Sequence, residues 1–561
     1  MPERRLSIPR NVSSICDYTR GSNEMKKLRI HKGKLNIIEM TYVLLPLVLF
    51  VFGWTRWYIA GVCFLVAFFC YRGLFKTFMQ KEDAIDISTP LLIAGVLFLL
   101  LVGYSCGWGR WVRQPAIDYE KHNAILADLT NQSWPVYYNN GDEHAMLTYY
   151  IGQYLVPAFV GKLFRSFRMA EIVTFVWSSL GVILVWIHLL CSLRITKPKR
   201  QIASAVFLTL FSQPLFLAEL IGDLLGVPIH SSLANTDWFS IVSEAGIHIQ
   251  YSSNYVLLNW VFPQTIVCWI TTLLLIDYKE EIRYYIPLAL PSMLFSALSF
   301  VGVVMVASAY AVVDLMRDYK IKAWVKKIIS TENILFMATV GSVLLLYFAG
   351  NVLSAKPKEM QFYFSPVAKE PLLFLVFYVF CVMPYPLCLV RWCKKEALFW
   401  IATAILFLLP LLHLGMVNDL MMRASIPALF IIMYEILRVY NEHEGQSDEK
   451  IIKRIKSSGK NILIAGILAL FLLYGAIYPI SNVISNMKTS KGLETTELYT
   501  WGTTGIYADR NLETEKIARI REKVYNYFSY DVEETVFYRF FARKNITEDD
   551  IVDEKYKSSI R

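Results

Sequence analysis

The stretch AMLTYYIGQYLVPAFVGKLF, residues 145–164, decides how this chain crosses a membrane. It is as long and as apolar as a transmembrane helix. If it were a span, however, the strongly basic turn LRITKPKRQ (193–201) would fall outside the cytoplasm, although Lys and Arg mark cytoplasmic loops. Tyr149, Tyr150 and Tyr154 are typical of a membrane interface. We therefore predict that 145–164 is a helix lying at the outer interface, and that 171–193 is the next span.

The composition is that of a membrane protein. Of 561 residues, 55% are hydrophobic and 18% charged, and the mean hydropathy is +0.41, whereas soluble domains are about 25% charged. The net charge of +10 comes from short basic clusters between apolar runs, which argues against a nucleic-acid partner. The nine cysteines form no CxxC pair and are interpreted as buried apolar residues. The first 34 residues are polar and basic, so we expect no cleavable signal peptide.

The basic loops then predict an all-α polytopic protein with about 13 transmembrane helices. A cytoplasmic N-terminus (1–34) precedes a transmembrane domain (35–481) and a small extracytoplasmic C-terminal domain (482–561). The predicted spans are residues 37–54, 57–72, 89–109, 171–193, 201–220, 254–276, 284–299, 300–316, 333–353, 371–390, 397–414, 424–440 and 461–481. The outer loops are residues 110–170, 221–253, 354–370 and 413–423.

The first outer loop contains AIDYEKHNAILADL, residues 116–129. Asp118 and His122 are four residues apart and share one face of a helix. We predict an amphipathic helix on the membrane surface, with Asp118 as a general base because partial desolvation makes a carboxylate more basic. An ordinary solvated loop is the alternative.

Other outer segments carry candidate binding residues. Asp419 and Arg423 are again four residues apart, and an outer arginine is suited to a lipid-borne phosphate, although the two can also form a simple ion pair at a helix end. In the second loop, aromatic and polar side chains together are suited to sugar rings, or to an interfacial belt. The further candidates are Trp238, His248, Tyr251 and Asp237 for the acceptor, and Arg113 and Lys358 for the phosphate.

The order of these segments resembles the GT-C superfamily of integral membrane glycosyltransferases. A span leads into a long outer loop with an Asp near its start, then into YYIGQYLVPAFVGKLF (149–164) and a span ending in LCSLRITKPKR (190–200). The resemblance implies a polyprenyl-phosphate sugar or lipid-linked donor, and a catalytic acid that maps to Asp118. The acidic doublet common in that superfamily is absent at Asp118, and the nearest one is Asp142–Glu143, so either site is a candidate base.

The expected activity is therefore transfer of a sugar to a hydroxyl of a glycan, lipid or protein, on the outer side of a bacterial-type inner membrane. His122 would orient Asp118 or contact the donor phosphate, and arginine or a divalent cation such as Mg²⁺ or Mn²⁺ would stabilise the leaving phosphate. The chain shows no P-loop, zinc-type spacing or GxSxG motif. A polysaccharide polymerase or ligase would depend on outer arginines more than on an acid. A transporter or flippase would carry charges deep in its spans. His188 and Glu435 lie near or within predicted spans and keep this alternative open.

Overall fold

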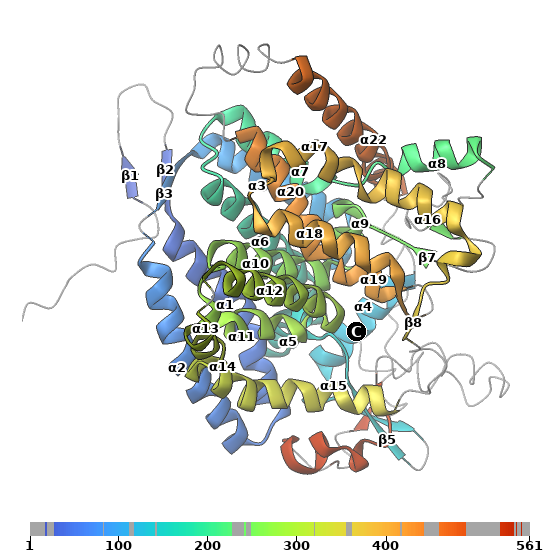
Figure 1. Cartoon of the computed structure of the whole chain (residues 1–561). Coiled ribbons are helices and arrows are strands. Elements are labelled where there is room, and N and C mark those ends of the chain that lie inside the picture. The colour runs from blue at the N-terminus through green and yellow to red at the C-terminus, as the bar shows by residue number, and fades with distance from the viewer. Residues whose placement is uncertain are drawn as a thin grey trace, which may run out of the picture.

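The computed structural model describes residues 17–19, 27–81, 83–111, 117–140, 143–226, 241–242, 248–318, 320–354, 362–415, 418–441, 459–489, 528–543, 546 and 551–552. Most of these residues are helical (Figure 1). The helices are α1 (Lys32–Trp54), α2 (Trp57–Met79), α3 (Thr89–Ser105), α4 (Ile117–Asn131), α5 (Gly152–Phe164), α6 (Phe167–Ser192), α7 (Pro198–Leu210), α8 (Leu215–Leu224), α9 (Asn254–Trp260), α10 (Phe262–Asp277), α11 (Tyr285–Ala289), α12 (Ala297–Asp318), α13 (Ile321–Ile328), α14 (Thr331–Phe336), α15 (Ser342–Ser354), α16 (Pro371–Phe377), α17 (Pro384–Cys393), α18 (Ala397–Leu408), α19 (Asp419–Ala424), α20 (Ile426–Asn441) and α22 (Gly459–Thr489).

The strands are short and lie outside the helix bundle. They are β1 (Asp17–Thr19), β2 (Lys27–His31), β3 (Ala84–Ser88), β4 (Tyr137–Asn140), β5 (Glu143–Leu147), β6 (Ile241–Val242), β7 (His248–Ile249), β8 (Phe362–Phe364), β9 (Leu412–Leu414), β10 (Phe528–Ser529) and β11 (Ile551–Val552). They form sheets of order β1-β2-β3, β10-β5-β4-β11, β6-β7 and β8-β9.

The described helices confirm a multi-pass membrane protein. By length and composition 7 of them can cross a membrane, or up to 9 if each of two bent pairs is one span. The bent pairs are α7 with α8 and α16 with α17, and three shorter apolar helices are α3, α10 and the helix beginning with α18. The predicted number of about 13 therefore remains a prediction. The predicted pair 284–299 and 300–316 is divided differently, because short turns over 282–294 precede one continuous helix, α12.

One end of the bundle, called the N-terminal end, is defined by β2 and β3. There the amide of Lys32, the first residue of α1, donates to the carbonyl of Asp83, the residue just before β3, at 2.8 Å. The end of α6 reaches the same place through an ion pair between Arg194 and Asp83. The end of α10 reaches it through Asp277, which pairs with Lys32. Helices α1, α6 and α10 therefore share this end.

The opposite end, called the loop end, is defined by β4 and β5 and by the tail residues 528–543. The Arg56 amide in the α1–α2 turn donates to the Phe541 carbonyl, and Asn351 at the end of α15 donates to the Phe528 carbonyl. Strand β10 pairs antiparallel with β5, and β11 pairs parallel with β4, so tail residues supply both outer strands of this sheet. In Figure 1 the tail elements and β5 lie far from β2 and β3.

The stretch that decides the topology does not form a span. Residues 143–147 are strand β5, and the helix α5 contains 13 residues, or about 20 Å, against about 30 Å of hydrocarbon. Its second half exposes Phe159, Leu163 and Phe164. The prediction that 171–193 is the next span is confirmed by α6, a candidate span from Phe167 to Ser192.

Close helix contacts depend on two small residues. A Cβ on Gly302 of α12 would lie 2.2 Å from the Ala424 carbonyl oxygen, and a Cβ on Gly95 of α3 would lie 2.1 Å from the Trp186 ring. Neither distance is possible for a side-chain atom, so these glycines let the helices approach one another, as is usual in membrane bundles.

Candidate functional site

The turn GWGR, residues 107–110, ends α3 at the loop end. Gly107 and Gly109 both have φ 77° and Arg110 has φ 53°. A Cβ on Gly109 would lie 2.9 Å from the Glu171 carbonyl oxygen, so only glycine fits beside α6. A positive φ is unusual for arginine, and such strain clusters at functional sites.

This turn places Arg110 in a cluster of charges at the start of α6. Arg110 pairs with Glu171 at 2.9 Å, and Arg168 pairs with the other oxygen of the same carboxylate at 2.9 Å. Arg168 also donates to the Gly109 carbonyl and lies over the Trp111 ring at 4.3 Å. Two guanidinium groups therefore share the carboxylate of Glu171 at the loop end. Sequence analysis did not predict this cluster, because its partners are about 60 residues apart along the chain.

His122 lies beside this cluster and is almost fully buried, with 8% of its surface exposed. Its Nε2 lies 3.1 Å from the Trp260 carbonyl, which only accepts, so Nε2 carries the proton. Its Nδ1 then accepts from the Tyr154 hydroxyl at 2.5 Å. Both ring nitrogens are therefore held, by α9 on one side and by α5 on the other.

These groups line one small cavity, which we call the His122 pocket. The cavity volume is about 10 Å³, enough for about one water molecule. The pocket is lined by Trp108, Gly109, Arg110, Tyr119, His122, Asn123, Leu126, Tyr154, Glu171, Thr174 and Phe262.

Asp118 belongs to α4, one helical turn before His122. The predicted helix is therefore confirmed, and its backbone places residues 118 and 122 on the same face. The Asp118 side chain lies outside the described part of the structure. The predicted position on the membrane surface is wrong for the second half of α4, because residues 124–130 are all buried inside the protein.

Asp419 and Arg423 form the ion pair that their spacing predicts. Asn418 caps α19, since its side chain accepts from the Met421 amide and donates to the Leu412 carbonyl. Arg423 is largely buried, and within the part of the chain that the structure describes its Nε–H has no hydrogen-bond partner. An unsatisfied buried donor is costly, which favours a ligand acceptor at this position.

The segment 149–154 connects the two clusters. Three effects act on the pKa of the Tyr150 phenol: burial raises it, the positive charge of Arg423 lowers it, and the negative charge of Asp419 raises it. Tyr150 therefore lies near both charged groups. Four residues later, in the first turn of α5, Tyr154 contacts His122. The Tyr347 hydroxyl, which donates to the Leu147 carbonyl, also accepts from the Tyr149 amide and so fixes the start of the segment. Tyr150 of the first outer loop therefore lies near the loop 413–423, which agrees with the predicted grouping of these loops at one end.

Asn259 adds an unsatisfied polar group next to this region. It is completely buried, and neither polar atom of its side-chain amide has a hydrogen-bond partner among the residues described. Its neighbour Trp260 holds His122. Buried amides without partners mark places where water or a ligand completes the bonding.

The remaining candidates are not brought into these clusters by the described part of the structure. Tyr251 is buried, donates to the Leu406 carbonyl at 2.6 Å and packs against Phe377. Its predicted role at the acceptor is not supported by any of these contacts. Only the backbones of Glu143 in β5 and His248 in β7 are described. The candidates that lie outside the described residues are Arg113, Asp142, Asp237, Trp238 and Lys358.

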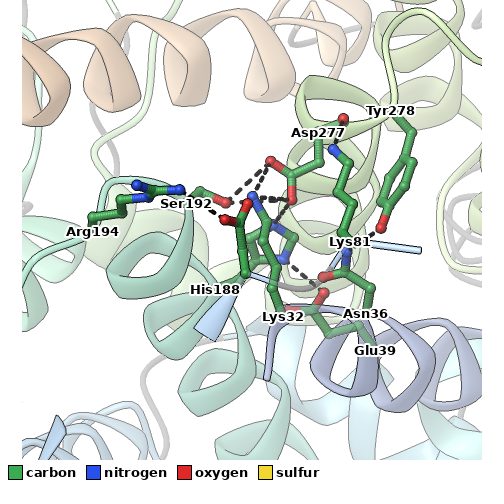
Figure 2. A network of polar contacts seen from close by, with 10 residues as sticks. Lys32, Asn36, Glu39, Lys81, His188, Ser192, Arg194, Asp277 and Tyr278 are labelled. Atoms are coloured by element: carbon green, nitrogen blue, oxygen red, sulfur yellow. Dashed lines mark hydrogen bonds and ion pairs between the residues drawn. The ribbon is translucent and has the colours of Figure 1, made fainter. Parts of the chain in front are cut away.

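A second polar cluster lies at the N-terminal end, inside the bundle (Figure 2). His188 of α6 contacts Glu39 of α1 through Nδ1 at 2.6 Å and Asp277 of α10 through Nε2 at 2.9 Å. Lys32 pairs with Asp277 at 2.8 Å. Each of the two contacts between a ring nitrogen and a carboxylate requires one proton. With these two protons and the ammonium of Lys32, the group of Lys32, Glu39, His188 and Asp277 has no net charge. Figure 2 also shows Asn36 bonded to Tyr278, and Lys81 beside Asp277.

Metal ligands do not gather in the described part of the chain. Among those residues, no three His, Cys, Asp or Glu side chains are grouped so that they could hold a metal ion.

Comparison of the chain with models of protein families, with curated proteins and with solved structures finds no match.

Proposed function

We propose that the chain is a membrane glycosyltransferase of the GT-C type, which transfers a sugar from a polyprenyl-phosphate donor to an acceptor hydroxyl at the loop end. The observation that supports this most is the segment 149–154. Through Tyr150 and Tyr154 it joins Arg423 to His122, one helical turn from Asp118. This supports a site in which an acid and a cation from two predicted outer loops act together.

In the proposed reaction Asp118 takes the proton of the acceptor hydroxyl while that oxygen attacks the anomeric carbon. The bond between the anomeric carbon and the phosphate oxygen breaks, and its electron pair leaves with the phosphate. Arg423 binds that phosphate and stabilises the new charge, because its Nε–H has no hydrogen-bond partner among the described residues. Arg110 and Arg168, which both pair with Glu171, place two guanidinium groups beside the pocket.

His122 is a positioning residue in this account. Its two ring nitrogens are already bonded to Tyr154 and Trp260, so the ring cannot turn without breaking a hydrogen bond. It fixes the face of α4 that also carries Asp118.

The test is an Asp118→Asn variant of the full chain in proteoliposomes, with a panel of undecaprenyl-phosphate hexoses as donors and release of undecaprenyl phosphate as the readout. The amide cannot accept the proton, so we expect at least a 10²-fold loss of rate. The matched control is Asp86→Asn, an exposed acid of β3 at the N-terminal end, which should keep the wild-type rate. An Asp118→Asn enzyme with full activity would move the base to Asp142 or Glu143.

The same assay separates transfer from the polymerase or ligase alternative. That alternative predicts that Asp118→Asn is tolerated and Arg423→Ala is not. Our proposal expects both variants to lose activity, with undecaprenyl phosphate binding lost only in Arg423→Ala.

Ion-coupled transport is a second candidate, and the buried cluster of Glu39, His188 and Asp277 favours it. Ionisable groups inside a membrane bundle mark proton or ion pathways in many transporters. Transport predicts that Glu39→Gln abolishes proton-driven uptake or flipping of a lipid-linked sugar. Transfer predicts that Glu39→Gln affects activity only as far as it lowers stability.

A further inference from the structure

Arg72 is a charged residue in an unusual place. It belongs to α2, a candidate span, seven residues before the helix ends at Met79, which is about 10 Å along the helix axis from that end. Its side chain is exposed, and in the described part of the chain it has no ion pair or hydrogen bond. Lys76 lies one turn further on, on the same face, and is also exposed. An unpaired arginine at this depth is costly in lipid.

Arg72 lies in an apolar groove between α1 and α2. The groove has a volume of about 410 Å³. It follows α2 from Cys63 to Phe75, a length of about 18 Å. The lining residues are Leu44, Leu47, Val48, Val51 and Phe52 of α1, Cys63, Phe64, Ala67, Phe68, Tyr71, Arg72 and Phe75 of α2, and Val340. Arg72 is the charged member of this lining, at the N-terminal end of the groove.

We propose that this groove binds one hydrocarbon chain of an anionic membrane phospholipid, whose phosphate is held by Arg72 and Lys76. A guanidinium donates two parallel N–H groups to a phosphate, and an ammonium adds a second positive charge. The exposed rings of Phe64 and Phe68 form the outer wall against the chain. The phosphate then supplies the partner that Arg72 lacks among the described residues.

A phospholipid explains the groove better than a second protein helix does. A docked helix would have to bring an acidic side chain into the apolar layer to pair with Arg72, which is itself costly. A phospholipid carries its phosphate at the membrane surface, within reach of a long arginine side chain that extends toward water. The basic end of the groove, at Arg72 and Lys76, points toward the N-terminal end, opposite the proposed transfer site, and the apolar part runs from there along α1 and α2. This inference does not depend on the proposed function.

The test is native mass spectrometry of the full chain, extracted from membranes of equal parts phosphatidylglycerol and phosphatidylcholine. We expect wild-type protein to retain phosphatidylglycerol preferentially. The double variant Arg72→Gln/Lys76→Gln should lose at least 10-fold of that preference. Ala67→Trp, which fills the groove and keeps both charges, should also lose it. The control Lys394→Gln/Lys395→Gln removes two charges elsewhere at the N-terminal end and should behave as wild type.

Two outcomes would overturn the proposal. One is retention of phosphatidylglycerol that neither the charge variant nor Ala67→Trp changes, which would show bulk lipid around the whole bundle. The other is displacement of phosphatidylglycerol by an equimolar amount of undecaprenyl phosphate, which would assign the groove to the isoprenoid instead. Thermal unfolding of each variant shows that the change in lipid binding does not come from loss of the fold.

Discussion

At the scale of single residues, the Tyr154 hydroxyl holds His122 in place. Tyr154→Phe removes that hydroxyl and leaves the ring, so we expect kcat to fall about 10-fold while undecaprenyl phosphate binding is unchanged. The cost in stability should be about 1 kcal/mol. The measurement is the donor assay with kcat and KM determined separately.

Tyr251→Phe is the matched control for this substitution. Its hydroxyl is also buried and also makes a hydrogen bond, to the Leu406 carbonyl. We expect a similar loss of stability and a normal kcat. Equal effects of the two variants on kcat would mean that Tyr154 acts only through the fold.

Contacts of individual residues also show which parts of the candidate site could be predicted from the sequence. The spacing of Asp419 and Arg423 predicted their ion pair, and the spacing of Asp118 and His122 predicted a helix, because contacts within one helix follow from periodicity. The Arg110–Glu171 and His122–Tyr154 contacts could not be predicted in this way. The first depends on the packing of the turn after α3 against α6, and the second on the packing of α4 against α5. The spacing of residues along the chain does not contain this information.

At the scale of elements, α5 carries a lysine whose protonation depends on its surroundings. Lys162 donates to the Gln132 carbonyl and lies over the Trp134 ring. Burial lowers its pKa from 10.5 to about 8. Between these two values the unfolded chain binds more protons than the folded one, so the free energy of unfolding rises with pH.

Lys162→Met should remove this rise. We expect the stability of wild type minus that of Lys162→Met to increase from pH 8 to pH 10.5, the interval set by the two pKa values. Thermal unfolding in detergent over this range measures it, with Lys199→Met, an exposed lysine, as the control. A flat difference would contradict the position of Lys162.

The buried cluster joins α1, α6 and α10 at the N-terminal end. Asp277→Asn leaves the Lys32 ammonium buried without its carboxylate, so we expect a loss of about 3–5 kcal/mol. Lys32→Met in the same protein removes the unpaired charge and should recover part of that loss. A double-mutant cycle on the unfolding temperature measures the coupling. Simply additive effects would contradict a direct interaction between the two residues.

At the scale of the whole molecule, the arrangement of the two ends followed from simple charge counting. Basic loops assigned 145–164 to the surface and grouped the first loop, 354–370 and 413–423 at one end. The pairing of β8 with β9 and the influence of Arg423 on the pKa of Tyr150 agree with that grouping. The sheet formed by β4, β5 and the tail was not predicted, because its outer strands have only 2 residues each, too few for a periodic pattern.

The orientation of the two ends in the membrane can be measured directly. Asn131→Cys lies at the loop end and Lys199→Cys at the N-terminal end, and both positions are exposed. All eight cysteines in the described part of the chain are buried, so a Cys16→Ser background leaves little competing reaction. An impermeant maleimide should label Asn131→Cys in intact cells, and Lys199→Cys only after permeabilisation. The reverse pattern would place the transfer site in the cytoplasm.

The central claim is that the loop end binds a lipid-borne phosphate between Arg423 and the His122 pocket. The most direct measurement is a cryo-electron microscopy map of the full chain in lipid nanodiscs loaded with undecaprenyl phosphate, the product common to all donors of this class. We predict density for the phosphate within hydrogen-bond distance of the Arg423 guanidinium, on the side that faces Tyr150 and His122. A phosphate found elsewhere, or a continuous path through the bundle without a phosphate at the loop end, would contradict the account.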